Sequence, residues 1–290
     1  MSAPTLLAVP NFSEGRDRST IELIGAALGA GLLDVHSDQD HHRTVYTLAG
    51  GPGELAGAVL EGARKALELL DLRCHQGVHP RVGALDVAPI VYLTDEDRGA
   101  ACAEALVLAD RLAHELGLTV FLYGELAQGR TRAELRRGGP ERLAERIAQG
   151  ALRPDFGPAT LGPRAGATLV AARPPLVAFN VELAPPATLA DAQAIATRIR
   201  EGGDEGLESV RAIGLWLASR GVAQVSTNVE DHRRTPLKKL IEAISRHARP
   251  ARTELVGLAP AAAFDGFPAD LPVANRRLIE DAIADRLHSA

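Results

Sequence analysis

Two histidines and an arginine lie close together in one short segment, from His75 to Arg81. A histidine near its ordinary pKa of about 6.5 can take up a proton at neutral pH and return it later. Arg81 cannot act as a base, but its guanidinium can bind a carboxylate or stabilise a developing anion. Because Gly77 and Gly83 disfavour regular structure and Pro80 has no backbone N–H, we predict a loop suited to acid–base group transfer. A solvated turn without a chemical role is the alternative.

A second polar segment runs from His36 to Arg43 and is dense in histidine and aspartate. If it is extended, the alternate residues His36, Asp38 and Asp40 share one face and could hold zinc or manganese with histidines of the first segment. In a second interpretation His42 and Arg43 bind an anionic substrate, and in a third the segment is an exposed loop. We favour the substrate site and expect no metal, because glycine and proline in the first segment break the helix on which paired histidine ligands lie.

A third candidate is the polar turn at residues 11–15, between a predicted strand and a predicted helix. Backbone N–H groups at a helix N-terminus can bind an anion, although a capping turn without a ligand is the default interpretation. The chain has no GxSxG motif, no phosphate-binding P-loop and no GxGxxG motif after a strand. Histidine acid–base chemistry therefore fits the sequence better than hydrolysis through a serine.

Bulk composition excludes several classes of protein. The 290 residues predict two domains, and the net charge of −5 gives no basic surface for nucleic acid. Apolar runs are shorter than the roughly 18 residues that a membrane span needs, and the first residues lack the features of a signal peptide. Cys74 and Cys102 have no CxxC spacing. We therefore expect a soluble, cytoplasmic protein without nucleic-acid or membrane partners.

Strand and helix patterns alternate along both halves of the chain. In the first half we predict strands near residues 6–9, 31–35, 44–48, 84–93 and 118–123, with helices near 17–28, 55–70 and 94–116. Residues 128–163 are rich in arginine, glycine and proline and predict a linker with one helix at 140–148. In the second half we predict strands near 167–172, 176–183, 210–217, 221–229 and 253–258, with helices near 189–200 and 236–247. This order indicates an α/β (α+β) fold with two domains of similar make-up, residues 1–150 and 151–290.

Segments along most of the chain resemble the formiminotransferase family. One of them is the run His-Pro-Arg-Val-Gly-Ala-Leu-Asp-Val at residues 79–87. Further matching segments lie at residues 9–15, 33–35, 43–45, 122–125, 154–158, 178–180, 223–228 and 255–258. Because these segments keep their order from residue 9 to residue 258, chance is a poor explanation for the resemblance.

The resemblance implies two ferredoxin-like α/β subdomains with the substrate bound between them, in a homodimer. It also implies transfer of a formimino group from N-formimino-L-glutamate to N5 of tetrahydrofolate, the co-substrate, with release of glutamate in histidine degradation. By the same resemblance His79 is the catalytic histidine. It would take the N5 proton as that nitrogen attacks the formimino carbon, and would return it to the departing glutamate nitrogen.

The resemblance also places the folate-binding segment at residues 157–166. Its matching positions are Gly157, Pro158, Pro163 and Gly166. Both substrates carry glutamate carboxylates, which guanidinium groups bind well. The expected substrate-binding residues are Arg81, His36, Asp38, His42 and Arg43, and Arg164 is a further candidate for anion binding.

Two positions depart from the family pattern. Val78 stands before His79 where many relatives carry glutamate, and His36 replaces an aspartate. Loss of a carboxylate beside the base would lower the pKa of the base. We therefore keep two alternatives to the transferase: a folate-binding protein without transfer activity and, with less support, a metal-dependent hydrolase.

Overall fold

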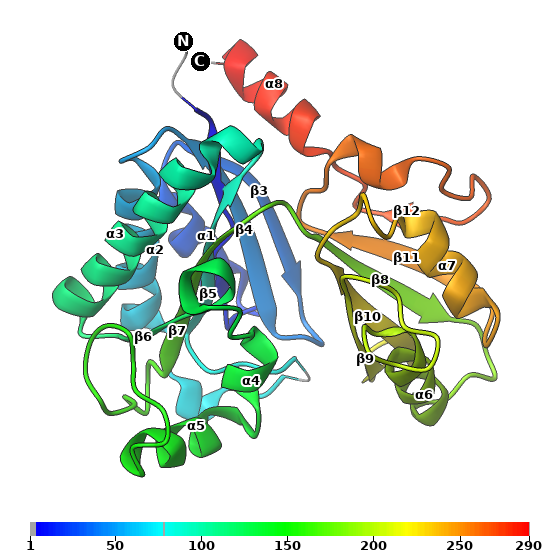
Figure 1. Cartoon of the computed structure of the whole chain (residues 1–290), viewed down its shortest axis with the longest axis horizontal. Helices are drawn as coiled ribbons and strands as arrows, with labels where there is room; N and C mark the ends of the chain where they lie inside the picture. Colours follow the sequence, from blue (N-terminus) through cyan, green and yellow to red (C-terminus); the bar gives the residue numbers. More distant parts are fainter. Residues whose placement is uncertain (1–3, 78, 290) are drawn as a thin grey trace. The chain divides into compact units, whose positions relative to one another are not determined.

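The computed structural model describes residues 4–77 and 79–289, so Val78 lies outside the described residues. The chain forms two compact units, Met1–Arg173 and Pro174–Ala290 (Figure 1). The boundary therefore lies later than the predicted one between residues 150 and 151. The reason is strand β7 (Ala167–Arg173), which was expected in the second domain but pairs with β5 (Leu85–Tyr92) and β6 (Thr119–Leu122) of unit 1.

Unit 1 contains a seven-stranded sheet and the helices that cover it. Besides β5, β6 and β7, its elements are β1 (Leu6–Ala8), β2 (Asn11–Phe12), α1 (Arg18–Leu28), β3 (Leu32–Asp38), β4 (Arg43–Gly50), α2 (Leu55–Leu69), α3 (Arg98–Leu116), α4 (Arg132–Arg136) and α5 (Gly139–Ala148). Strand β3 pairs with β4, β4 with β1 and β2, and these two with β5, all antiparallel. Strands β7 and β6 then extend the sheet in parallel. The described part of unit 1 from β2 to β5 thus has the order β-α-β-β-α-β.

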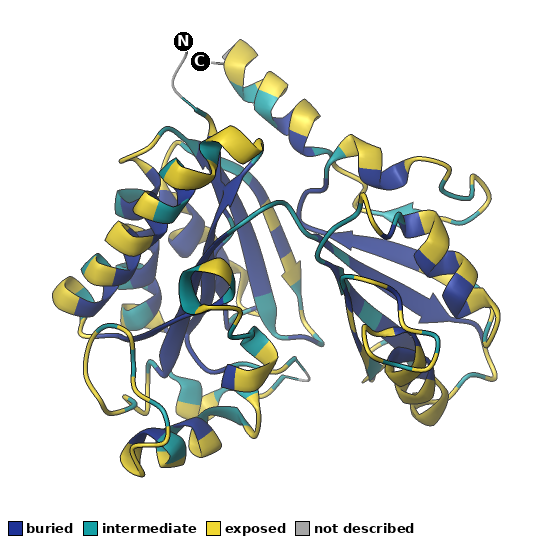
Figure 2. Cartoon of the chain, viewed as in Figure 1, coloured by how far each residue is buried: buried dark blue, intermediate teal, exposed yellow. Residues whose placement is uncertain are grey.

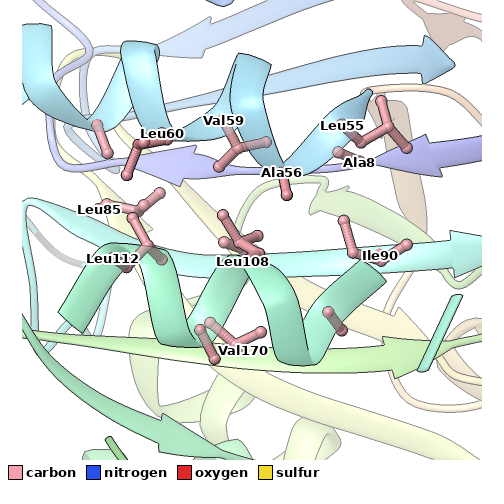
Figure 3. Close-up of a cluster of buried hydrophobic side chains, with 14 of the residues drawn as sticks. Ala8, Leu55, Ala56, Val59, Leu60, Leu85, Ile90, Leu108, Leu112 and Val170 are labelled. Carbon is pink, nitrogen blue, oxygen red and sulfur yellow. The ribbon is translucent and has the colours of Figure 1, made fainter. Parts of the chain in front are cut away.

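Helices α1, α2 and α3 form the largest core cluster of unit 1 together with strands β1, β4, β5 and β7. Apolar side chains recur on one face of each helix, as with Val59, Ala63 and Ala66 of α2, which is the pattern of a helix that covers a sheet. Figure 3 shows these helix faces gathered around Leu85 and Ile90 of β5. Every residue of β5 is buried, because this strand has neighbours along both edges and packing on both faces.

The substitution Leu108→Ala should destabilise unit 1 strongly. Leu108 of α3 is fully buried in this core, so its truncation removes apolar contacts and leaves a cavity. Such substitutions cost about 2–5 kcal/mol of unfolding free energy. Urea unfolding of the variant checks this, with Leu106→Ala as the matched control, since Leu106 lies on the same helix and is 40% exposed. Equal losses for the two variants would contradict the packing described.

The segment predicted as a linker belongs to unit 1. The predicted helix at 140–148 is confirmed as α5, but α4 precedes it and both helices pack on the sheet. Leu135, Leu143 and Ile147 are buried against Phe121 and Leu169. The predicted linker was therefore wrong: its apolar side chains are few and widely spaced, but Leu135, Leu143 and Ile147 among them are buried in the core.

Unit 2 contains a five-stranded sheet in the order β12-β11-β8-β10-β9. Its elements are β8 (Val177–Leu183), α6 (Leu189–Ile199), β9 (Val210–Leu217), β10 (Val222–Val229), α7 (Leu237–Ser245), β11 (Pro250–Val256), β12 (Val273–Ala274) and α8 (Ile279–Ser289). Strand β8 runs antiparallel to both β10 and β11, and its alternate residues Phe179 and Val181 are buried in the core with α6 and α7. Figure 2 shows the largely buried strands and the half-exposed helices. The order from β8 to β11 is again β-α-β-β-α-β.

Short 3-10 helices complete the chain at Leu72–Cys74, Asp95–Asp97, Gly124–Ala127 and Ala261–Phe264. Among the described residues, no helix combines the length and the apolar character needed to cross a membrane. The prediction of a mixed α/β fold is confirmed by the two sheets and the helices that pack on them.

Candidate functional site

The candidate site lies at one end of the unit 1 sheet. Phe12 of β2 pairs with Thr44 of β4 and with Leu85 of β5. The residues after Phe12, before Thr44 and before Leu85 therefore come together, although they are far apart in the chain. They form the polar turn after β2, the β3–β4 hairpin and the loop that carries His75 to Arg81.

Two glycines let these three loops approach one another closely. A Cβ atom at Gly15 would lie 2.5 Å from the Arg43 amide nitrogen, and one at Gly77 would lie 2.7 Å from the His41 carbonyl oxygen. Real Cβ atoms do not approach other atoms so closely, so a larger residue at either position would separate the loops. Gly77, which led us to predict a loop from the sequence, thus also allows that loop to pack against the hairpin.

His79 forms a hydrogen bond with Arg43. The two nitrogens Arg43 Nη1 and His79 Nε2 are 2.8 Å apart. A guanidinium has only donors, so His79 Nε2 must accept, and a neutral ring then carries its hydrogen on Nδ1. The pKa of His79 lies well below its ordinary value, because the ring is buried and Arg43 and Arg136 repel a second positive charge. His79 is therefore a neutral imidazole at pH 7, as a general base must be.

Helix α4 adds Arg136 to this site. Arg136 forms an ion pair with the Asp86 carboxylate, which is 2% exposed and also accepts the Val82 N–H at 2.7 Å. Burial and the neighbouring charge of Arg136 lower the pKa of Arg43 to about 10. Arg132, on the same helix, repels positive charge on His79 in the same way. The surroundings of His79 are thus rich in guanidinium groups, which favour a bound anion.

Sequence reasoning missed both arginines of α4 because their segment had been read as a linker. One signal could have found the helix. Thr131 and Glu134 form a capping box at its start, with each side chain bonded to the backbone of the other residue. The pairing of Arg136 with Asp86 spans 50 residues and has no local signal.

His42 and His75 join the three loops to one another. His75 Nε2 donates to the His42 carbonyl oxygen at 2.9 Å, and the two rings stack with their centroids 4.1 Å apart. His42 Nδ1 accepts the Gly15 N–H at 3.1 Å, and Arg81 Nη2 donates to the His75 carbonyl oxygen at 2.7 Å. These residues hold the loops in place, and only Arg81 keeps a free donor: among the described residues, its buried Nε has no hydrogen-bond partner.

The substitution His75→Gln should reduce the pH dependence of stability. Burial lowers the pKa of His75 from 6.5 to about 4. Below pH 6.5, His75 is therefore protonated in the unfolded chain but stays neutral in the folded chain. The free energy of unfolding then falls as the pH falls toward about 4. Between pH 7 and pH 5 this loss amounts to about 2 kcal/mol at roughly 1.4 kcal/mol for each pKa unit.

Urea unfolding of the native chain and the variant at both pH values measures the difference. A glutamine amide still donates to the His42 carbonyl oxygen, so the loop contact is kept. The variant should lose less stability on acidification than the native chain. An equal loss for both would show that His75 takes up its proton normally in the folded state.

His36 and Asp38, which were also predicted to bind substrate, have structural contacts within strand β3 and the turn after it. His36 is buried within β3, opposite Val45. The Asp38 carboxylate accepts the His41 N–H at 2.7 Å and so supports the hairpin turn. Among the residues that the structure describes, no three or more His, Cys, Asp and Glu side chains are grouped to hold a metal ion. The structure brings Arg43, His79 and the Arg81 loop together.

The predicted folate segment, residues 157–166, lies beside the loop that carries His79. The Ala84 N–H donates to the Ala165 carbonyl oxygen at 2.8 Å, and the Ala167 N–H donates to the Val82 carbonyl oxygen at the same distance. Gly166 has a φ of 69°, and a Cβ there would lie 2.8 Å from the Gly83 Cα. This glycine is therefore required by the close contact of the two segments, whether or not a ligand binds.

The other predicted folate positions lie on the surface of unit 1. Gly157 has a φ of 79°, and a Cβ there would press on the Leu118 carbonyl group. Pro158 and Pro163 are exposed. Arg164 extends along the surface, with its Nε 3.6 Å from Asp71 and its side chain 54% exposed. These exposed prolines leave a surface on which a flat ring could lie.

Most of the chain is similar to known proteins of one family. Residues 5–173 match the model of the N-terminal subdomain of the formiminotransferase domain, and residues 178–265 match a second formiminotransferase domain model. The glutamate formimidoyltransferase of Thermoplasma acidophilum is 36% identical over 266 residues, which cover 87% of each chain. The corresponding protein of Streptococcus pyogenes serotype M1 is 37% identical over 268 residues, 88% of this chain and 89% of the relative.

A longer relative matches in part. The formimidoyltransferase-cyclodeaminase of Sus scrofa is 41% identical over 271 residues, which cover 87% of this chain and 49% of that protein. The chain thus spans about half the length of the curated bifunctional relatives that it matches.

Proposed function

The chain belongs to the formiminotransferase family, and we propose that it transfers a formimino group from N-formimino-L-glutamate to N5 of tetrahydrofolate. The reaction belongs to histidine degradation and one-carbon metabolism. The observation that carries the proposal is the neutral His79 imidazole, held on a loop among guanidinium groups. A neutral imidazole can take up a proton, and guanidinium groups bind the carboxylates that both substrates carry.

In the proposed reaction His79 acts first as a base and then as an acid. The N5 lone pair attacks the formimino carbon, and the N5 proton passes to the His79 imidazole. The bond from that carbon to the glutamate nitrogen then breaks, and the imidazolium returns the proton to the departing nitrogen. Protons balance, because His79 ends as it began. The low pKa of His79 makes its imidazolium a strong acid for the second step.

Two arginines are proposed to hold the substrate carboxylates. The buried Arg81 Nε has no hydrogen-bond partner among the described residues, and a bound carboxylate would supply one. Arg43 lies beside His79 and can place a carboxylate near the base. His42 and Asp38, also predicted to bind substrate, act in this proposal by shaping the hairpin that presents Arg43.

The folate site is proposed at residues 157–166. In support of it, the hydrogen bond from Ala84 to Ala165 attaches this segment to the loop that carries His79. The exposed Pro158 and Pro163 offer apolar surface to a flat pterin ring. Gly157 and Gly166 give the backbone conformation that presents them.

The finer fold assignment is also a proposal. The order β-α-β-β-α-β occurs in both units and supports the predicted pair of ferredoxin-like subdomains. The homodimer, the cytoplasmic location and the absence of a metal stay predictions.

The test of the function is an assay of the purified chain with N-formimino-L-glutamate and tetrahydrofolate. We expect glutamate release that requires tetrahydrofolate and continues after treatment with a chelator. Tetrahydrofolate binding without glutamate release would indicate the folate-binding alternative. Glutamate release that needs no tetrahydrofolate and stops with a chelator would indicate the metal-dependent hydrolase.

A further inference from the structure

The hydrogen bond between Arg43 and His79 occupies the nitrogen that a base would use. Arg43 Nη1 donates to His79 Nε2 at 2.8 Å, and the other ring nitrogen of the neutral imidazole carries the hydrogen. In this state neither ring nitrogen can accept a proton from a substrate. Proton uptake at Nε2 therefore requires Arg43 to move away first.

The charge of Arg43 is poorly balanced within the protein. Burial disfavours this charge most, and Arg136 and Arg132 repel it further. The carboxylates of Asp86 and Asp38 offset this only in part, since the pKa of Arg43 is still lowered to about 10. Asp86 is already engaged by Arg136 and by the Val82 N–H. No ion pair joins Arg43 to a carboxylate within the described ranges 4–77 and 79–289.

A carboxylate is the ligand that would compete best for Arg43. Guanidinium–carboxylate hydrogen bonds are charge-assisted and often paired, so they are roughly twice as strong as bonds between neutral groups. The imidazole of His79 offers Arg43 a single neutral acceptor and no charge. An entering carboxylate thus gives Arg43 both a second hydrogen bond and a counter-charge.

We propose that Arg43 masks His79 in the free protein, and that a carboxylate of the bound glutamate-type substrate draws Arg43 away and frees Nε2. The identity of the ligand in this inference rests on the proposed function. The masking of His79 Nε2 by Arg43 rests only on the hydrogen bond between them. It makes Arg43 a positioning residue with two states. The base becomes available only when the formimino donor is in place, which keeps His79 from taking up solvent protons before the reaction.

The test reads the position of the imidazole proton directly. Long-range ¹H–¹⁵N spectra of the histidine side chains show which ring nitrogen carries hydrogen, and the His79 signals are assigned by their loss in His79→Gln. We expect His79 of the native chain to carry its hydrogen on Nδ1. In Arg43→Met the donor is gone, and the hydrogen should move largely to Nε2. The matched control is Arg18→Met, because the Arg18 side chain is 91% exposed on α1 and should leave His79 unchanged.

Titration of the native chain with L-glutamate tests the release without any substitution. The His79 signals should move to those of a ring whose Nε2 no longer accepts from Arg43, with the same midpoint as binding measured by calorimetry. A native His79 protonated on Nε2, or glutamate that binds without moving the His79 signals, would overturn the proposal. Failure of glutamate to bind would instead count against the proposed substrate, and the Arg43→Met spectrum would then decide whether the mask exists.

Discussion

His79→Gln should transfer formimino groups about 10²–10⁴-fold more slowly than the native chain, the usual contribution of a general base. A glutamine oxygen can still accept a hydrogen bond from Arg43, so the loop keeps its shape, but an amide takes up no proton near pH 7. The loss should therefore appear in kcat, with little change in KM. Steady-state kinetics and calorimetric binding of tetrahydrofolate measure the two effects separately.

The matched control for this variant is His114→Gln. His114 lies on α3 with its side chain 75% exposed, outside the site, and its replacement should leave kcat unchanged. A His79→Gln variant that keeps more than about a tenth of the native kcat would fall outside the usual range for a general base. In that case another residue would have to accept the N5 proton.

The second large effect is expected for Asp86→Asn. The Asp86 carboxylate is 2% exposed, and it is the partner of Arg136 beside Arg43 and His79. Asparagine keeps the shape and can still accept the Val82 N–H, but it leaves Arg136 without its counter-charge. Removing one partner of a buried pair costs about 3–5 kcal/mol, and urea unfolding at pH 7 should show a loss of this size.

Two further variants test whether the unpaired charge of Arg136 causes the stability loss of Asp86→Asn. Adding Arg136→Met to Asp86→Asn removes the uncompensated cation, so the double variant should be more stable than the single one. Glu208→Gln breaks an exposed pair with Arg234 in unit 2 and should cost less than about 1 kcal/mol. If Asp86→Asn were as mild as Glu208→Gln, the buried pair would not support the site.

Secondary structure was well predicted where one face of an element is apolar. Helix α2 was expected at residues 55–70 and occupies Leu55–Leu69, because its buried positions repeat at helical spacing. Strand β8 was expected at 176–183 and occupies Val177–Leu183, with buried alternate residues. Such patterns are local and can be read from one sequence.

The domain boundary could not be read in this way. Strand β7 lies between β5 and β6 through parallel pairing, and nothing within residues 167–173 reveals which sheet it joins. Helix α4 is short and carries one buried leucine, Leu135, so it left little periodicity to detect. Both errors moved the predicted boundary into unit 1.

Sequence patterns also identified only part of the candidate site, because they show local motifs but not pairings between distant segments. His79, Arg81 and Arg43 stood out through their types and their resemblance to a family motif, and the structure brings His79 and Arg43 into contact. Arg136 was missed, because its role depends on a pairing with Asp86 that is distant in the chain. The hydrogen bond from Arg43 to His79 Nε2 could not be predicted, because residue types do not show which side chains come within bonding distance.

The most direct test of the central claim follows the formimino carbon itself. N-formimino-L-glutamate labelled with ¹³C at that carbon is mixed with tetrahydrofolate and the native chain, and the label is traced by NMR beside a His79→Gln sample. We predict that the label moves to N5 of the folate as glutamate appears in equal amount, and that it stays on glutamate with the variant. Label released as formamide or formate, with the folate unlabelled, would contradict transfer and indicate hydrolysis.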